Sequence, residues 1–148
     1  MLQQGALFLV VADGRRARVL IEQRRGAALE EPPEWALEIS PEELTEAQDR
    51  APRSFDRVGG HRHAMDGGRD LHEEEEERFL KRLADQIGAA EQAGAFAHMV
   101  IVAPPRALGR LRDYLPAAAK ARIRSETAKD LVDEDAAKLR ERLREWLR

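Results

Sequence analysis

The sequence predicts a single α/β domain with a mixed β-sheet of about five strands and helices packed against it. Short apolar runs of strand length come first, and helical patterns alternate with strands in the second half of the 148 residues. The predicted order is β-β-β-α-β-α-β-α, an antiparallel meander followed by right-handed crossovers. A chain of this length buries one core, so we expect residues 1–148 to form one domain.

The first three predicted strands form the meander. Residues 6–12 are a continuous apolar run, and Asp13-Gly14 favours a tight hairpin turn. Residues 17–22 form the returning strand. A third strand is predicted at 35–39, where large apolar residues alternate with Ala and Glu.

A helix is predicted to begin near Glu73 and to end at Gly94. The five glutamates at 73–77 are assigned to its first turns, where the helix dipole favours acidic side chains. Gly88 is expected to weaken this helix near its end. The apolar run at 99–103 then predicts a central strand that is covered on both faces.

The rest of the chain predicts two helices and one strand. A short amphipathic helix lies between Pro105 and Pro116, and a half-exposed strand follows at 121–126. Asp133 is the predicted N-cap of the last helix, in which apolar residues keep helical spacing as far as Leu147.

Residues 40–72 show no period and are punctuated by proline and glycine. An aperiodic segment of this length in a compact domain is expected to be functional or disordered. Residues 50–69 contain five arginines, two aspartates and two histidines. We therefore expect the loop at 53–66 to be the functional site, held outward by the sheet.

Composition limits the function classes. Because cysteine is absent, disulfides, thiolate nucleophiles and cysteine-bound zinc are excluded. No leader sequence or membrane-length apolar run is present, so we expect a cytoplasmic protein without membrane insertion. The net charge is −3, yet residues 106–124 hold six basic residues against one acid. These basic residues form a patch that can bind a polyanion. The alternative interpretation is that they only solvate an exposed helix face and an edge strand.

Four motifs stand in order along the chain: Ala12-Asp13-Gly14 with Ala17-Arg18; Arg53-Ser54-Phe55-Asp56 through Gly59-Gly60 to Arg62-His63-Ala64-Met65; Val102-Ala103-Pro104-Pro105 with Leu108-Gly109 and Leu111-Arg112; and Lys129-Asp130-Leu131. They resemble the bacterial host attachment protein family, which implies a role in attachment to host cells. The family is in turn similar to the middle domain of archaeal and eukaryotic translation release factors. In those factors a Gly-Gly-Gln loop enters the ribosomal peptidyl-transfer centre and promotes peptidyl-tRNA hydrolysis.

The resemblance places Gly59, Gly60 and His61 at the position of the Gly-Gly-Gln loop, as the candidate catalytic residues. Two glycines permit close approach of the backbone, and the His61 N–H can face a developing oxyanion. The histidine side chain differs from glutamine, and a domain that reads stop codons is missing. Codon-dependent termination is therefore not expected, and peptidyl-tRNA hydrolysis stays an open question.

The predicted binding surface combines the loop with the basic patch. Basic side chains contact RNA phosphates, so this surface fits a ribosome or a tRNA. The interpretation requires the loop to face outward and to lie near Arg122 and Arg124. Lys129 and Asp130 also have an alternative structural interpretation, as an ion pair between strands or as a cap at the start of the last helix. The predicted binding residues are Arg53, Ser54, Asp56, Arg57, Arg62, His63, Arg112, Arg122, Arg124 and Lys129.

Other chemistries are weaker. His61, His63 and His72 lie near Asp66 and Asp70, but without a metal-binding motif, so we predict no metal and no other cofactor. A ribonuclease-H-like topology suits the strand order, whereas such a nuclease needs several carboxylates at matching strand positions. A serine hydrolase that uses Ser54 and His63 lacks a nucleophile elbow.

Two hypotheses follow from the sequence. The first is a ribosome- or RNA-associated factor that acts through the Gly-Gly-His loop. The second is a protein-interaction or regulatory module that affects attachment to host cells indirectly. Whether the protein is an enzyme, and its oligomeric state, are left open by the sequence.

Overall fold

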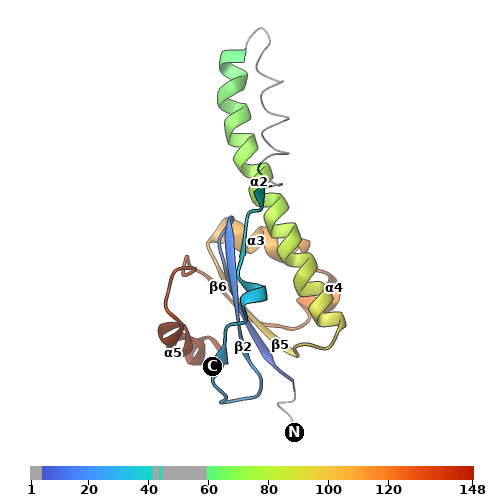
Figure 1. The fold of residues 1–148 in the computed structure, drawn as a ribbon, viewed down its shortest axis with the longest axis vertical. Helices are drawn as coiled ribbons and strands as arrows, with labels where there is room; N and C mark the ends of the chain where they lie inside the picture. Colours follow the sequence, from blue (N-terminus) through green and yellow to red (C-terminus); the bar gives the residue numbers. More distant parts are fainter. Residues whose placement is uncertain (1–4, 42–43, 45–59) are drawn as a thin grey trace.

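The computed structural model describes residues 5–41, 44 and 60–148, with residues 60–70 described by their backbone. Helices α2, α3 and α4 lie on one face of a mixed sheet and α5 lies on the other (Figure 1). The elements are β1 (Leu7–Ala12), β2 (Arg16–Glu22), β3 (Leu29–Glu30), η1 (Pro33–Trp35), β4 (Leu37–Glu38), α2 (Gly60–Gln92), β5 (His98–Ala103), α3 (Pro105–Tyr114), α4 (Ala117–Lys120), β6 (Ile123–Ala128) and α5 (Ala136–Trp146).

The sheet follows the order β3-β2-β1-β5-β6, and β4 also pairs with β2. β1 and β2 form the predicted antiparallel hairpin, from Leu7 opposite Glu22 to Ala12 opposite Ala17. β1 with β5, and β5 with β6, are parallel. The predicted single α/β domain with a mixed sheet is therefore confirmed.

The described sheet has six strands, because the predicted third strand is divided. β3 and β4 are two residues each, and the 3-10 helix η1 separates them. Pro32 immediately precedes this 3-10 helix and Pro33 begins it, and both lack the N–H that a sheet ladder needs. The apolar alternation at 35–39 thus gives a short edge strand, while Trp35 packs into the core.

The core lies on both faces of the central strands. Phe8 and Val10 of β1 point toward α2, whereas Leu9 and Val11 point toward α5. This alternation follows from the two-residue period of a strand. α2 covers its face with a stripe that is fully buried: Phe79, Leu80, Leu83, Ala84 and Ile87.

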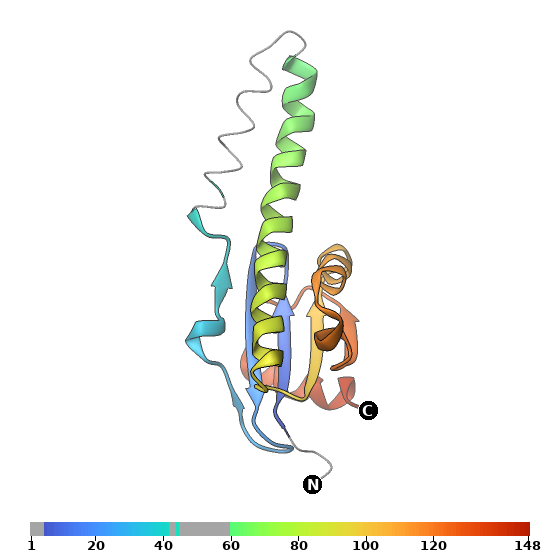
Figure 2. The same ribbon diagram turned by 90° about the vertical axis from the view of Figure 1, so that its right-hand side faces the viewer.

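Helix α2 begins at Gly60, well before the predicted start at Glu73. The predicted loop at 40–72 is therefore wrong for its last part. A helix of 33 residues is about 50 Å long, whereas strands of six residues span about 20 Å. The N-terminal part of α2 consequently extends beyond the sheet (Figures 1 and 2).

Two glycines define the other end of α2. Gly94 ends it as predicted, with a positive φ of 76° that favours glycine. Gly88 was expected to weaken the helix, but it has a packing role. A Cβ there would lie 2.8 Å from Cγ of Pro116, so glycine lets α2 approach the corner between α3 and α4.

Within the described ranges, no helix has both the length and the apolar character needed to cross a lipid bilayer.

Candidate functional site

The predicted functional loop at 53–66 falls into two parts, one before the start of α2 and one within that helix. Residues 53–59 lie outside the described residues, and with them Arg53, Ser54, Asp56, Arg57 and Gly59. The remainder, Gly60 to Asp66, is helical rather than a loop, and it contains Gly60, His61, Arg62 and His63. The first N–H groups of a helix have no carbonyl partner within it. These N–H groups are satisfied by capping side chains, by water or by a ligand.

The start of α2 faces away from the core. Figure 2 shows the first turns of α2, which begins at Gly60, projecting beyond the carboxyl ends of the parallel strands β1, β5 and β6. Among the described side chains of α2, Glu73 pairs with Arg110 of α3 and Glu75 pairs with Arg15 of the hairpin turn, about two fifths of the way along the helix. Residues 60–66 are the described part of the predicted loop, and their backbone projects outward from the sheet, as the RNA interpretation requires.

The predicted convergence with the basic patch is wrong. Nη2 of Arg122 lies 3.2 Å from Oε2 of Glu91, close to the C-terminal end of α2. Gly60 and Glu91 are about 45 Å apart along the helix axis. Arg122 and the start of α2 are therefore at opposite ends of the molecule. Because residues 60–72 have no helical period, the sequence did not predict that α2 is long enough to separate Gly60 from Arg122.

The other basic candidates are dispersed as well. Nη1 of Arg112 on α3 forms an ion pair of 2.7 Å with Oε1 of Glu126. Arg124 is exposed near the start of β6, and Lys129 is exposed just after the end of that strand. The ten predicted binding residues thus do not form one surface among those the structure describes.

The glutamate run occupies the middle of α2, so the prediction that it benefits from the helix dipole is wrong. Arginines from other elements compensate the run. Nη2 of Arg110 on α3 lies 3.2 Å from Glu73 and 3.8 Å from Glu77, and its Nη1 lies 3.7 Å from Glu76. These contacts hold α2 against α3 at the point where α2 leaves the sheet.

Glu75 is the buried charge of this region, with 3% of its surface exposed. Its Oε1 accepts a hydrogen bond of 3.0 Å from Nη1 of Arg15, and Nδ1 of His72 lies 3.5 Å away. Arg15 belongs to the turn between β1 and β2. Sequence reasoning missed this pair because sixty positions separate its members and no local pattern joins them.

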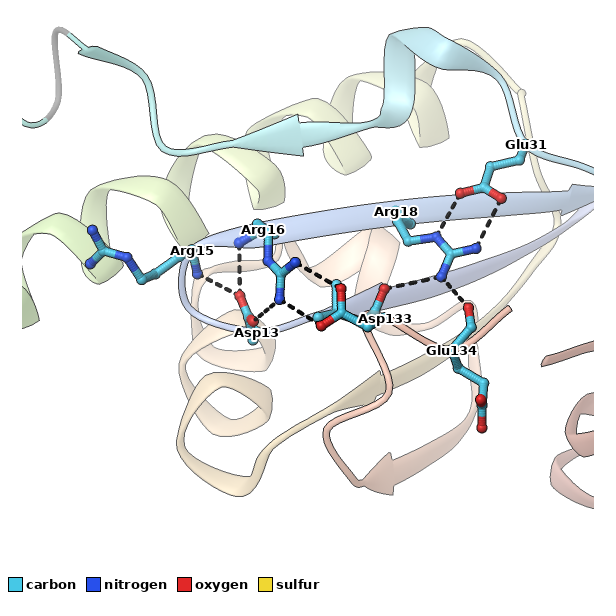
Figure 3. Close-up of polar contacts among 8 residues, drawn as sticks. Asp13, Arg15, Arg16, Arg18, Glu31, Asp133 and Glu134 are labelled. Atoms are coloured by element: carbon cyan, nitrogen blue, oxygen red, sulfur yellow. Dashed lines mark hydrogen bonds and ion pairs between the residues drawn. The ribbon is translucent and has the colours of Figure 1, made fainter. Parts of the chain in front are cut away.

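A second network ties the hairpin to the segment before α5 (Figure 3). Asp13 Oδ1 accepts the N–H groups of Arg15 and Arg16, each at 2.8 Å. The guanidinium of Arg16 donates to both oxygens of Asp133, at 2.8 and 3.1 Å. Hydrogen bonding to Arg16 lowers the pKa of Asp133. The predicted N-cap role of Asp133 is wrong, since Asp135 caps α5 by accepting the Lys138 N–H at 3.0 Å.

Arg18 completes this network. Its Nε and Nη2 donate to Glu31 at 2.6 and 3.0 Å, and its Nη1 donates to the carbonyls of Val132 and Glu134. Hydrogen bonding to Glu31 raises the pKa of Arg18, and the same contact lowers the pKa of Glu31. Both groups therefore stay charged, and the network has a structural role.

No cluster of three or more metal-binding side chains occurs within the described part of the chain. His72 is exposed on α2 next to Glu75, while His61, His63, Asp66 and Asp70 have no described side chains. Asp13 lies in the hairpin turn, hydrogen-bonded to that turn's own N–H groups. Its role in a nuclease centre is therefore not favoured.

A family described as protein required for attachment to host cells matches residues 8–143. The match spans the sheet and the helices on both of its faces. No curated protein matches the sequence.

Proposed function

The chain belongs to the family of proteins required for attachment to host cells, and we propose that it acts as an RNA-contacting factor. The contact element is the start of α2 with the sequence before it, which resembles the Gly-Gly-Gln region of a release-factor middle domain. Arg122 and Arg124, which the sequence interpretation required near this element, lie at the other end of the molecule and are not part of the proposed contact. The observation that carries the proposal is the projection of the first turns of α2 beyond the sheet, since Gly60 and His61 are the first two residues of this helix.

The way α2 is anchored supports this role. Arg15 and Arg110 bind the glutamates where α2 leaves the sheet, and the apolar stripe from Phe79 to Ile87 fixes its second half. Because a continuous helix is stiff, the projecting turns hold the tip at a constant distance from the domain. A contact element of this kind reaches into a narrow space that the domain itself does not enter.

The sequence around the start of α2 favours RNA. Arg53, Arg57 and Arg62 stand within ten positions of one another and offer charge to phosphates, which gives binding that weakens as salt rises. In a peptidyl-tRNA complex the His61 N–H would donate to the oxyanion formed when water attacks the ester carbonyl. The proposal thus includes a peptidyl-tRNA hydrolase-like step, which is tested separately from binding.

Crosslinking and capture of the full chain, with and without nuclease, tests RNA contact. We expect ribosomes or tRNA to be captured at low salt, and we expect Arg57→Glu with Arg62→Glu to abolish capture. A matched double variant, Arg24→Glu with Lys138→Glu, changes the charge equally on other exposed positions and should retain capture. Equal loss in both double variants, or no RNA in any sample, contradicts RNA contact.

Hydrolysis is tested with a model peptidyl-tRNA. Gly60→Ala should slow the release of the peptide without weakening tRNA binding, because a methyl group at this position hinders close approach of the backbone. Equal rates with and without the protein would remove the hydrolytic step and leave the binding proposal intact.

The second candidate is a protein-interaction module that uses the same tip. Arg112 and Arg122 are held by Glu126 and Glu91, which reduces the positive surface available to RNA on the body of the domain. This candidate predicts partners that remain after nuclease treatment. Partners that disappear with the RNA would exclude it.

A further inference from the structure

Two adjoining cavities lie at the end of the sheet opposite to the projecting half of α2. The smaller has a volume of about 100 Å³ and includes Leu7, Glu22 and His98, which are register partners at this end of the sheet. The larger has a volume of about 490 Å³ and is formed with α5. Glu22, Arg25 and Leu147 border both cavities, which together we call the basic groove. Its basic residues are Arg25, His98, Arg124, Arg140, Arg144 and Arg148.

These residues come from distant parts of the chain. Arg25 lies in the turn between β2 and β3, and Arg124 lies at the start of β6. Arg140 and Arg144 are four positions apart on α5 and share one helix face. Nη1 of Arg140 donates to the Ala27 carbonyl at 3.2 Å, which holds the turn that carries Arg25 next to α5.

The described side chains that line the groove compensate only part of its positive charge. Glu22 is the one carboxylate among its lining side chains, and it accepts a hydrogen bond from the Gly26 N–H at 3.3 Å. Arg25, Arg124 and Arg144 make no ion pair within the described ranges of the chain. A basic side chain in the last turn of a helix is stabilised by the helix dipole, which explains the position of Arg144 in α5. Arg25 and Arg124 do not lie on a helix, so the dipole does not explain their positions.

The state of His98 agrees with a positive potential in the groove. Burial and the nearby charges of Arg124 and Arg122 lower its pKa, so the neutral form is favoured. Several cations that share one cavity repel one another unless an anion enters. The arrangement therefore favours an anionic ligand over a neutral or cationic one.

We propose that the basic groove binds an organic phosphate of nucleotide size. Guanidinium groups donate in pairs to phosphoryl oxygens, and Arg25 and Arg124 border the smaller cavity. That cavity has the volume of roughly three water molecules, which suits one phosphoryl group. The larger cavity lies within the range of small-molecule sites, and Leu143 and Leu147 give it an apolar wall for the rest of the ligand.

This inference does not depend on RNA contact at the tip, which lies at the other end of the molecule. Its test uses the full chain and follows backbone amide shifts by NMR during titration with adenosine monophosphate, inorganic phosphate or adenosine. We expect the monophosphate to shift the amides of Leu7, Glu22 and His98, and inorganic phosphate to shift the same amides at a higher concentration. Adenosine should leave them unchanged.

Arg25→Gln and Arg124→Gln should each weaken binding of the monophosphate at least tenfold. Arg24→Gln is the matched control, because it is an exposed neighbour of Arg25 that does not line the groove, and it should keep the affinity. Adenosine that binds as tightly as its monophosphate would overturn the proposal. So would an Arg24→Gln variant as weak as Arg25→Gln, or an absence of shifts with either phosphate.

Discussion

At the carboxyl end of the parallel strands Arg16 and Arg18 are bound by carboxylates, whereas at the amino end Arg25 and Arg124 line an open groove and Arg122 pairs with Glu91. Arg16 and Arg18 at the first end bind Asp133 and Glu31. Arg25 and Arg124 at the second end line the smaller cavity, where Glu22 is the one carboxylate among the described lining side chains. The same residue type therefore stabilises the fold at one end and is available to a ligand at the other.

The largest difference between the two ends should appear on removing one arginine from each. Arg18→Ala is expected to lower the free energy of unfolding by about 1–3 kcal/mol, since it breaks the Glu31 pair and leaves the carbonyls of Val132 and Glu134 without a donor. Arg25→Ala should change it by less than about 0.5 kcal/mol, because no described contact is lost. Denaturant unfolding of both variants measures this, and equal losses would refute the comparison.

Arg15→Ala should have a smaller effect, of about 1 kcal/mol. It leaves the carboxylate of Glu75 buried without its guanidinium partner, but the Arg15 side chain is 44% exposed, so solvent weakens the original pair. Glu75→Gln added to Arg15→Ala should restore part of the stability, because the buried charge is then absent. A double-mutant cycle by chemical denaturation measures the coupling. A coupling of zero would mean that Arg15 does not hold Glu75.

The smallest expected effect is a dependence of stability on pH. Arg18 lowers the pKa of Glu31 from its ordinary value of 4.5. A lowered pKa in the folded state gives stability that is present above 4.5 and is lost as the pH falls through the folded value. The wild type should therefore lose more stability between about pH 5 and pH 3 than Glu31→Gln does.

Arg18→Ala is the control for this effect. Once the guanidinium is absent, adding Glu31→Gln should cause no further change in the pH dependence. If Glu31→Gln flattened the profile equally with and without Arg18, the shift would have a cause other than this pair.

Local patterns predicted the strands of the sheet and the end of α2. The apolar runs at 6–12 and 99–103 correspond to β1 and β5, because a strand buried on both faces is apolar at every position. Asp13-Gly14 gave the hairpin, and Gly94 gave the end of the helix. Each of these features depends on residues that are neighbours in the sequence.

The start of α2 was missed for a physical reason. Residues 60–72 have no apolar stripe, and Gly67 and Gly68 have low helix propensity. Once residues 73–92 pack on the sheet, the helix is already nucleated, and each added residue gains a hydrogen bond without paying that cost again. The conformation of residues 60–72 and their distance from Arg122 were therefore not predicted, and the role of the loop residues stays a prediction.

The sequence alone determined the strands β1, β2, β5 and β6, the antiparallel hairpin and the apolar faces of the core, because these depend on periods of two and 3.6 residues that are visible locally. The tertiary structure decided which arginines are bound and which line the groove. Pairs such as Arg16 with Asp133 and Arg15 with Glu75 join residues far apart in the chain, so only folding brings their charges within a few ångströms.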